Sequence, residues 1–455
     1  MSFTISTGAQ TVINTLEKSG FKAYIVGGAV RDMLMNKTPH DFDIATSALP
    51  EQIKKIFRRT IDTGLKHGTV TVVENNVGYE VTTFRSESGY TDSRHPDSVN
   101  FITSIEEDVK RRDFTINAMA YNPHDGLFDC VGGTNDLENK IVRCVGVPEV
   151  RFSEDPLRML RAVRFAAQLN FEIDSECERA IKKLAPLIKK VSSERIREEL
   201  NKILMSENSE KISILHNLGL LKLIIPEVDL CSGVAQKNKY HIYDVYEHIM
   251  HTVKSTPPDM VLRWSALLHD IGKPNCASCD SNGIIHFYGH HRESVRMAND
   301  ILHRLHFDSE TAHDILILIE NHDVRIENTP PGVKRMMAKT GARLFEKLIM
   351  LQEADNKAKN EKFFREKKKR LDETLEIYGR ILSEHQPYMI SDLTVNGRDL
   401  IKIGYKPGRS LGDCLKRLLD EVIINPELNR REYLLAKAKE IKKSGAKYKN
   451  TKMPF

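Results

Sequence analysis

A glycine-rich turn followed by two acidic residues is the part of the sequence best suited to chemistry. The turn reads GGAVRD over residues 27–32, and the acids are Asp41 and Asp43 in the segment DFDI. Glycine lets backbone N–H groups approach a bound anion at Gly28, and Arg31 offers a planar fork for phosphate oxygens. Two carboxylates beside a phosphate site can hold Mg²⁺ for phosphoryl or nucleotidyl transfer. A plain turn with two surface acids is the alternative, but the order of the features favours the metal-dependent site.

The residues around the two acids predict a strand that points both carboxylates the same way. Side chains at positions i and i+2 of a strand share one face, so Asp41 and Asp43 lie together while Phe42 and Ile44 enter the core. An apolar run at residues 23–26 predicts another strand, which ends at the glycine turn.

A β-hairpin is predicted shortly afterwards. Two β-rich runs, residues 69–73 and 79–84, flank an Asn-Asn pair typical of tight turns. Glu80 lies on the second run and is a candidate third carboxylate, although an edge-strand charge fits it equally well. Residues 85–99 are polar and rich in turn formers, which predicts a mobile functional loop.

Two later segments combine arginine with aspartate. Arg112 and Asp113 in RRDFTINA suit contacts to phosphates and ribose hydroxyls, although the segment alone also reads as a helix N-terminus. The second segment, EDPLRMLRAVRF, lies in a predicted helix.

A charged helix is predicted from Glu154 to Leu169. Four charged residues recur at every third position: Asp155, Arg158, Arg161 and Arg164. At about 100° per residue they occupy one half of the helix, while apolar residues fill the other half. An aspartate and an arginine one turn apart can read the edge of a base, and the further arginines can meet a triphosphate. A solvated face is the alternative, but like charges without intervening acids repel one another unless an anion binds.

Composition sets the broad class of the protein. The 455 residues exceed one ordinary core and predict three or more domains. The formal charge of +5, from 68 Lys+Arg against 63 Asp+Glu, identifies no partner by itself. No apolar run approaches the length of a membrane span and the first residues do not resemble a secretion signal, so we expect a cytoplasmic protein without membrane contact. Seven cysteines without framework spacing predict reduced thiols.

Six motifs together resemble those of the class II tRNA nucleotidyltransferases, or CCA-adding enzymes, and of the closely similar bacterial poly(A) polymerases. They stand in order over about residues 20–230 and read GGAVRD, DFDIAT, EVTTFR, YTDSRHPD, RRDFTINAMA and EDPLRMLRAVRF. The YTDSRHPD segment resembles the flexible element associated in this family with the switch from C to A addition. Its presence argues against an enzyme that adds only CC.

The resemblance implies roles for the residues named above. Asp41 and Asp43 would be the catalytic residues that hold Mg²⁺. The nucleotide would be bound by eight residues: Gly28, Arg31, Arg112, Asp113, Asp155, Arg158, Arg161 and Arg164. Among these, Asp155 and Arg158 would form a protein template that selects first CTP and then ATP, and Arg112 with Asp113 would contact the ribose.

A second candidate metal site begins after about residue 237, where histidine becomes frequent. Neutral imidazole and carboxylate are suitable ligands for a divalent metal such as Ni, Mn or Co. Six residues resemble the H, HD, H, H, D pattern of the HD phosphohydrolases: His248, His269, Asp270, His290, His322 and Asp355. His291 is an alternative to His290. The pattern predicts a metal-binding module, and it leaves open whether the module hydrolyses a substrate or persists as a scaffold.

The resemblance divides the chain into four expected parts. Residues 1–145 form an α+β head of the polymerase β nucleotidyltransferase type, with a small mixed sheet and helices, and residues 146–236 form an all-α neck and body. Residues 237–375 form an HD-type helical domain, and residues 376–455 form a helical tail that engages tRNA. The basic run 365–370 is expected to be a solvated connector or, alternatively, a tRNA contact.

The expected activity is addition of CCA to the 3′ end of tRNA from CTP and ATP by two-metal nucleotidyl transfer. A poly(A) polymerase with the same head is one alternative. Another is a phosphohydrolase that removes 2′,3′-cyclic or 3′ phosphates from RNA ends through the HD module. The sequence leaves a monomer and a homodimer equally open.

Overall fold

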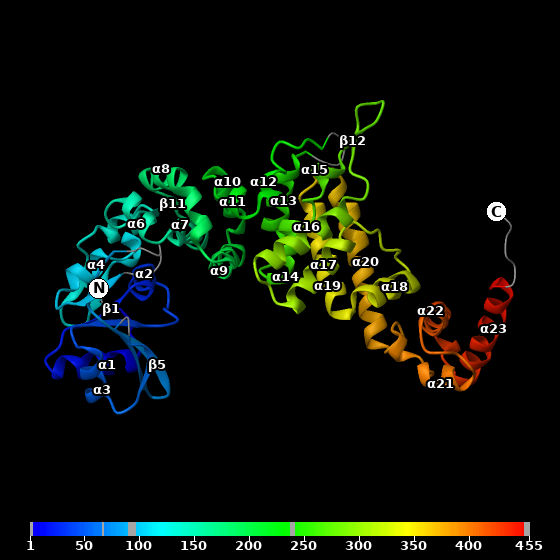
Figure 1. Ribbon diagram of the computed structural model, residues 1–455, viewed down its shortest axis with the longest axis horizontal. Coiled ribbons are helices and arrows are strands. Elements are labelled where there is room, and N and C mark those ends of the chain that lie inside the picture. The colour runs from blue at the N-terminus through cyan, green and yellow to red at the C-terminus, as the bar shows by residue number, and fades with distance from the viewer. Residues whose placement is uncertain (1–2, 66–67, 90–96, 237–241, 450–455) are drawn as a thin grey trace. The chain divides into compact units, whose positions relative to one another are not determined.

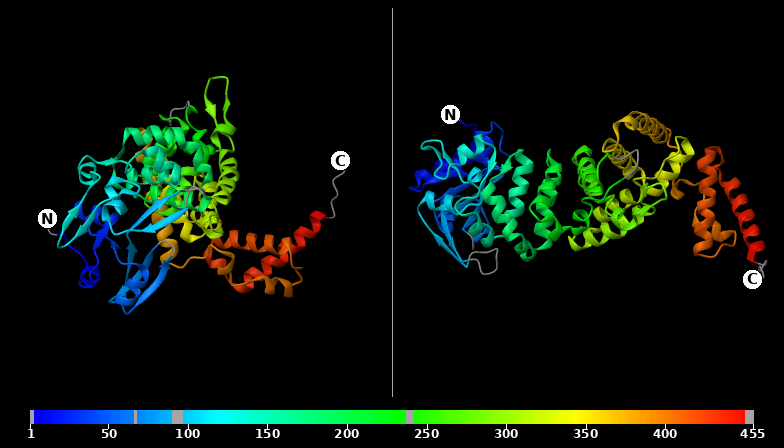
Figure 2. Two further views of the ribbon diagram at one scale, coloured as in Figure 1. Left: turned by 60° about the vertical axis from the view of Figure 1, so that its left-hand side comes forward. Right: turned by 90° about the horizontal axis from the view of Figure 1, so that it is seen from above.

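The computed structural model describes residues 3–65, 68–89, 97–236 and 242–449. They form two compact units, Met1–Asp229 with Arg304–His306, and Leu230–His303 with Phe307–Phe455. Strands gather in the N-terminal part, and the remainder is almost entirely helical, as predicted (Figures 1 and 2). No described helix has both the length and the apolar character needed to cross a bilayer.

The N-terminal unit begins with a seven-stranded sheet in the order β3-β4-β5-β2-β1-β8-β9. Strands β2 and β5 run parallel and the other neighbours run antiparallel, so the predicted small mixed sheet is confirmed. The strands are β1 (Ala23–Val26), β2 (Asp43–Thr46), β3 (Thr60–Gly64), β4 (Thr69–Glu74), β5 (Val77–Thr83), β8 (Ala120–Asn122) and β9 (Gly126–Phe128).

Helices pack on both faces of this sheet. On one face lie α1 (Thr7–Lys18), α2 (Gly28–Leu34) and α3 (Pro50–Ile56), and on the other lies α4 (Ile105–Lys110). Ile25 belongs to the first apolar cluster, whereas its neighbours Tyr24 and Val26 belong to the second. This alternation is the two-residue period of a strand, and burying a side chain such as Ile25 contributes about 2 kcal/mol.

The predicted hairpin is present and the predicted loop after it is partly wrong. Asn75 and Asn76 have φ values of 51° and 63°, the left-handed pair that a tight hairpin turn requires. Within residues 85–99, β6 (Arg85–Ser88) instead pairs antiparallel with β7 (Ser98–Phe101). Most of the YTDSRHPD motif, residues 90–96, lies outside the described residues.

The neck consists mainly of short helices, as expected. After the predicted boundary at residue 145 they are α6 (Pro148–Glu154), α7 (Leu157–Leu169), α8 (Ser175–Leu184), α9 (Ser193–Leu204), α10 (Ile214–Asn217), α11 (Leu221–Ile224) and α12 (Pro226–Asp229), while α5 (Gly133–Glu138) precedes it. One detail differs from an all-α neck, because β10 (Ile141–Val142) pairs in parallel with β11 (Glu172–Ile173). This small strand pair joins the two sides of the boundary predicted at residue 145.

The second unit is a helical array with one short hairpin. Its helices are α13 (Val245–Ser255), α14 (Met260–Leu268), α15 (Lys273–Cys276), α16 (His290–Arg304), α17 (Ser309–Asn321), α18 (Pro330–Thr340), α19 (Ala342–Lys357) and α20 (Phe364–Ser383). The hairpin pairs β12 (Ser278–Cys279) with β13 (Ile285–His286). The tail helices α21 (Gly397–Lys402), α22 (Arg409–Ile424) and α23 (Arg431–Lys449) have an apolar core of their own.

Candidate active sites

The glycine turn and Asp43 meet where two central strands of the head sheet end, since Val26 of β1 pairs with Asp43 of β2. Strand β1 runs into Gly27, whose φ of +73° is a left-handed conformation that favours glycine. A Cβ atom at Gly27 would lie 3.9 Å from Asp43 Oδ2 and 3.5 Å from Arg112 Nη1. On the next residue, a Cβ atom at Gly28 would lie 3.4 Å from Arg31 Nη2. The turn therefore has Asp43 and Arg112 beside its first glycine and Arg31 beside its second.

The carboxylates of the head are close enough to affect one another. Partial desolvation by the surrounding chain, followed by the negative charges of Asp41 and Glu80, raises the pKa of Asp43 to about 6. Strand β2 begins at Asp43, and Glu80 stands beside it on the parallel neighbour β5. Among the described residues these three acids do not form a group whose oxygen atoms all lie within 4.8 Å. Of the two predicted acids, Asp43 is the first residue of β2 and Asp41 lies two residues before it, so the prediction that one strand carries both is wrong.

The pattern of burial along this segment agrees with the sequence prediction. Phe42 packs against the apolar cluster of the head and Ile44 is fully buried, whereas both aspartates are exposed. A carboxylate pair that water and a substrate can reach suits a metal that shares its coordination with phosphate oxygens.

Three arginines surround one aromatic ring in the same unit. The guanidinium carbons of Arg31, Arg161 and Arg164 lie 5.6, 5.7 and 4.2 Å from the ring centre of Phe165. Burial, together with the positive charges of Arg161 and Arg31, lowers the pKa of Arg164 to about 10. Arg31 is held in place by a 2.8 Å hydrogen bond that it donates to Asn117 Oδ1. Guanidinium groups gathered in this way offer planar hydrogen-bond donors of the kind that suit phosphate oxygens.

The arginines of α7 have acidic neighbours, so the prediction that they lack intervening acids is wrong. Each of them pairs with an acid from outside the predicted charge pattern: Arg158 with Glu154, Arg161 with Asp113, and Arg164 with Glu199. The Arg164–Glu199 pair is buried, with 3.1 Å between nitrogen and oxygen. Sequence spacing along one helix could not reveal acids that come from α9 or from the segment before η2 (Thr115–Asn117).

The structure places the ribose candidates next to the arginine cluster. Asp113 accepts a 2.8 Å hydrogen bond from Arg161 Nε and another from the Phe114 N–H. Although burial opposes ionisation, Arg161 and these hydrogen bonds lower the pKa of Asp113. The neighbouring Arg112 reaches Asp108 at 3.2 Å, while its Nε is buried without a hydrogen-bond partner.

The helix predicted from Glu154 to Leu169 is broken at its start. Helix α6 ends at Glu154 and α7 begins at Leu157, because Pro156 keeps the preceding residue out of the helical conformation. Asp155 is extended, with φ −140° and ψ 101°, and lies in the link between the helices. The two template candidates are therefore a link residue and Arg158 in the first turn of α7.

Both template candidates are held by protein contacts. Asp155 accepts hydrogen bonds from the Leu157 N–H at 3.1 Å and from Arg195 Nη2 at 2.9 Å. Arg158 Nη1 donates to the carbonyl oxygen of Arg151 at 3.1 Å. Arg195 was not anticipated, since nothing in the sequence connects it to residue 155.

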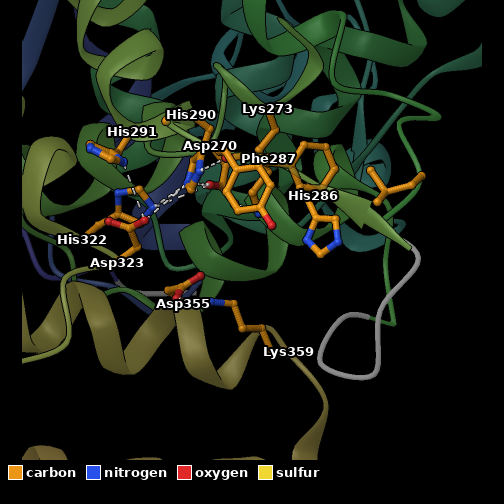
Figure 3. Close-up of a pocket in the computed structure, with 13 residues that line it drawn as sticks. Asp270, Lys273, His286, Phe287, His290, His291, His322, Asp323, Asp355 and Lys359 are labelled. Carbon is orange, nitrogen blue, oxygen red and sulfur yellow. Dashed lines mark hydrogen bonds and ion pairs between the residues drawn. The ribbon is translucent and has the colours of Figure 1, made fainter. Parts of the chain in front are cut away.

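The six HD-pattern residues form one cluster in the second unit. Ligand atoms of His248, His269, Asp270 and Asp355 all lie within 4.8 Å of one another, and Asp270 also groups with His290 and His322. Five helices or helix ends contribute them: α13, the end of α14, the start of α16, the end of α17, and α19. Figure 3 shows most of these side chains converging on one pocket.

The distances within this cluster are short. His248 Nε2 lies 3.0 Å from Asp355 Oδ1 and 3.3 Å from His269 Nε2. Asp270 bridges both groups, with Oδ2 3.1 Å from His269 Nε2 and Oδ1 3.3 Å from His290 Nε2. His291 groups instead with Asp323 and His290, so the geometry favours His290 over His291 as the residue near Asp270.

Backbone carbonyls orient the four histidines. Each Nδ1 lies within hydrogen-bond distance of a carbonyl oxygen: His248 to Ala358 at 3.2 Å, His269 to Ala266 at 2.8 Å, His290 to Phe287 at 2.9 Å, and His322 to Ile319 at 2.7 Å. A carbonyl only accepts, so each Nδ1 carries a proton, and each Nε2 is directed toward the cluster. Both buried oxygens of Asp270 also lack a hydrogen-bond donor in good geometry. This donor set fits a divalent metal.

The ionisation of the two aspartates in the cluster also suits a divalent metal. Burial opposes ionisation of Asp270 and Asp355, yet His269, Lys273 and Lys359 hold the pKa values of both carboxyls well below the usual range. Burial also opposes protonation of His269, but Asp270 and Asp355 raise its pKa to about 9. The carboxylates are thus ionised and attract positive charge.

Two lysines beside the cluster were missed by the sequence analysis. Lys273 Nζ lies 2.6 Å from Asp270 Oδ2, and Lys359 pairs with Asp355. Their spacing of three and four residues from a ligand was the available signal, since such pairs share a helix face. The basic run 365–370 is also more than a solvated connector, because Lys367, Lys369 and Arg370 line a cavity that reaches His322 and Asp355.

Comparison with known proteins gives three family matches along the chain. The "Poly A polymerase head domain" matches residues 23–143, and the "Probable RNA and SrmB- binding site of polymerase A" matches residues 170–231. The tRNA nucleotidyltransferase domain 2 matches residues 293–438.

Relatives and solved structures agree with these matches. A CCA-adding enzyme of Ligilactobacillus salivarius is 34% identical over 437 residues, which are 95% of this chain and 96% of that protein. The chain belongs to the CCA-adding enzyme family. The crystal structure of the Bacillus stearothermophilus CCA-adding enzyme in complex with CTP is 30% identical, with a TM-score of 0.74 over 97% of this chain and 98% of that one.

Other relatives match only in part. The CCA-adding enzyme of Lactobacillus helveticus is 53% identical over 203 residues, which cover 45% of this chain and 51% of that protein. The matched region therefore spans about half the length of this relative and of three others with similar identity. None of these descriptions mentions an HD domain, so that part of the resemblance stays a prediction.

Proposed function

We propose that this protein adds CCA to the 3′ end of tRNA, with CTP and ATP as substrates. The observation that carries the proposal is the glycine turn, which has Asp43 and Arg112 on one side and Arg31 on the other. Membership of the CCA-adding enzyme family supports the same activity. The four-part division of the chain and the binding of tRNA by the neck and tail are parts of this proposal.

The residues divide the work of nucleotidyl transfer between them. Asp41 and Asp43 hold Mg²⁺, which when bound activates the 3′ hydroxyl and neutralises charge on the phosphates. Arg31 and Arg161, with Arg164 behind them, hold the triphosphate so that the hydroxyl of tRNA faces the α-phosphate. The bond to the α-phosphate forms as pyrophosphate leaves, and orientation by these side chains lowers the barrier.

Base selection is assigned to Asp155 and Arg158 without a nucleic-acid template. A carboxylate acceptor and a guanidinium donor three residues apart can read either cytosine or adenine through hydrogen bonds. Loss of one such partner costs on the order of 1–3 kcal/mol of discrimination. Arg195 holds Asp155 by the hydrogen bond at 2.9 Å and so fixes one side of the reading pair.

The test is incubation of the protein with Mg²⁺, all four nucleoside triphosphates and a tRNA that lacks CCA. The expected product ends after three added residues, in the order C, C, A. A long adenosine tail would assign the chain to poly(A) polymerase activity instead. A product that stops after CC would contradict the role given to the YTDSRHPD segment.

A second function is proposed for the histidine-rich centre, namely metal-dependent hydrolysis of phosphate esters at RNA ends. The observation that favours it is the set of Nδ1 hydrogen bonds, which aims four Nε2 atoms at Asp270 and Asp355 before any metal arrives. Ni, Mn and Co are the candidate metals, since imidazole and carboxylate suit all of them. Lys273 and Lys359 are placed to meet the phosphate.

This second function is tested by loading the full chain with each metal and supplying RNA that ends in a 2′,3′-cyclic or 3′ phosphate. Release of phosphate, or opening of the cyclic ester, is the expected result. A protein that binds metal but releases nothing from either end would reduce the centre to a structural scaffold.

A further inference from the structure

An aromatic segment lies at the mouth of the histidine-rich centre. His286, Phe287 and Tyr288 line the same cavity of about 360 Å³ as Asp270 and His290. In Figure 3, His286 and Phe287 stand on one side of this pocket, and the metal-type ligands stand on the other. The cavity has the size of a small-molecule site.

The outermost ring of this segment is unusually open to solvent. Tyr288 is 77% exposed, more than any other large hydrophobic side chain among the described residues. Its ring nevertheless has a fixed partner, because it stacks on His286 with 5.2 Å between ring centres and 9° between planes. His286 is itself held by Asp280, 3.0 Å from its Nε2. An ordered aromatic stack with one free face is a platform for another flat ring.

The platform is tied directly to a metal-type ligand. The Phe287 carbonyl oxygen accepts the 2.9 Å hydrogen bond from His290 Nδ1 that orients this imidazole. Gly289, with φ +76°, turns the chain between them, and His290 is the first residue of α16. On the inner side, Lys273 Nζ lies 5.5 Å from the Phe287 ring centre and 2.6 Å from Asp270. The aromatic ring of Phe287, the ammonium group of Lys273 and the metal-type ligands Asp270 and His290 therefore lie next to one another.

We propose that His286, Phe287 and Tyr288 form a base-stacking platform, so that the centre acts on nucleoside phosphates in preference to phosphate esters without a base. The inference rests on the phosphohydrolase function proposed above. A phosphate at Asp270 and Lys273 places its nucleoside toward the mouth, where Tyr288 offers a free face. A free mononucleotide and the terminal nucleotide of an RNA share this chemistry, and the experiment distinguishes them.

The kinetic test compares three substrates with the same metal: adenosine 3′-monophosphate, an RNA oligonucleotide with a 3′ phosphate, and glycerol 2-phosphate. Tyr288→Ala should lower kcat/KM by about tenfold for the substrates that carry a base, within the range known for one stacked base. It should leave glycerol 2-phosphate unchanged, and Tyr288→Phe should retain the wild-type values. Of the two nucleotides, the one with the higher wild-type kcat/KM identifies the source. An equal loss on all three substrates, or no loss on any, contradicts the platform.

The matched control for these variants is Ile284→Ala. Ile284 is 39% exposed and precedes β13 of the same hairpin, but it does not line the cavity. Its substitution should change none of the three values. A loss equal to that of Tyr288→Ala would assign the effect to the hairpin as a whole and overturn the role of the stack.

A labelling experiment separates this inference from the proposed hydrolysis. Photolysis of 8-azidoadenosine 3′-monophosphate, with saturating CTP to occupy the head, should attach the label within residues 285–290. Label there without any hydrolysis would keep the platform and remove the phosphohydrolase function. Label only elsewhere in the chain would remove the platform, whatever the rate of hydrolysis.

Discussion

The two candidate metal sites of this protein are built in opposite ways. In the head, Asp41 and Asp43 are exposed, and partial desolvation together with the neighbouring carboxylates of Asp41 and Glu80 raises the pKa of Asp43 to about 6. In the helical unit, the ligands His248, His269 and Asp270 are fully buried or nearly so, and backbone carbonyls orient their imidazoles. The difference predicts that a metal in the head would complete its coordination with nucleotide phosphates, whereas the helical centre offers enough protein ligands to hold a metal before a substrate binds.

The largest expected effect comes from substitutions in the acid pair of the head, which test whether this site holds a metal. Asp41→Ala and Asp43→Ala should each lower nucleotide incorporation by at least about a thousandfold, since a metal ion stabilises transition-state charge by several kcal/mol. Affinity for tRNA, measured by filter binding, should change less than about twofold, because these carboxylates hold metal and not RNA. Wild-type incorporation by either variant would remove the head site, and Asp62→Ala, at an exposed residue on β3, is the control.

The helical centre is tested by His269→Ala. After dialysis, the metal content of this variant should be lower than that of the wild type by a factor of about 100 or more, because a direct ligand is lost. Elemental analysis measures the metal content. CCA addition should stay within about twofold of wild type. The control is His313→Ala, at an exposed residue of α17 outside the cluster. If nucleotide addition fell together with metal content, the two sites would not be independent.

Base selection gives a smaller effect. Arg158→Ala should reduce the preference of the head for CTP and ATP over UTP and GTP by about tenfold, the loss expected for one hydrogen-bonding partner. Ratios of kcat/KM for the four triphosphates measure it. Arg179→Ala, an exposed arginine on α8, should leave the ratios unchanged. An unaltered preference in Arg158→Ala would remove the template role.

The smallest effect concerns pH and stability in the absence of Mg²⁺. A carboxyl whose pKa is raised to about 6 disfavours the folded state once it ionises, so this cost is absent below about pH 4 and complete above about pH 6. Asp43→Asn should therefore raise the free energy of unfolding at pH 8 by less than about 1 kcal/mol, a small value because the residue is exposed to solvent. Thermal unfolding at pH 4 and pH 8 checks it. Equal differences at both values, or a difference that Mg²⁺ does not reduce, would contradict the crowding of the acids.

Local patterns predicted much of the fold and the two clusters. The period of two around Phe42 and Ile44, and the Asn-Asn turn before β5, depend on neighbouring residues, which a sequence displays directly. The HD-pattern residues could be named in advance because each of them is a metal-type ligand with a recognisable neighbour. Residues 90–96, with the expected switching element, remain a prediction because they lie outside the described part of the chain.

The rest depended on contacts between distant segments. The acids that neutralise Arg161 and Arg164 are 48 and 35 positions away in the chain, and Arg195 reaches back 40 positions to Asp155. The spacing of residues along one helix or strand gives no information about ion pairs between such distant segments. The break before α7 had a local signal in Pro156. The three-residue charge repeat continues across this proline and so predicted one unbroken helix.

The position of Asp155 in a link, and not in α7, has a practical consequence for protein engineering. Of the two residues proposed to read the base, Asp155 precedes α7, whereas Arg158 lies on this helix together with Arg161 and Arg164. Substitutions in the link should therefore change which nucleotide is accepted while leaving the proposed phosphate contacts of α7 in place. Variant libraries designed to change which nucleotides are added should therefore randomise the link between α6 and α7 and leave α7 unchanged.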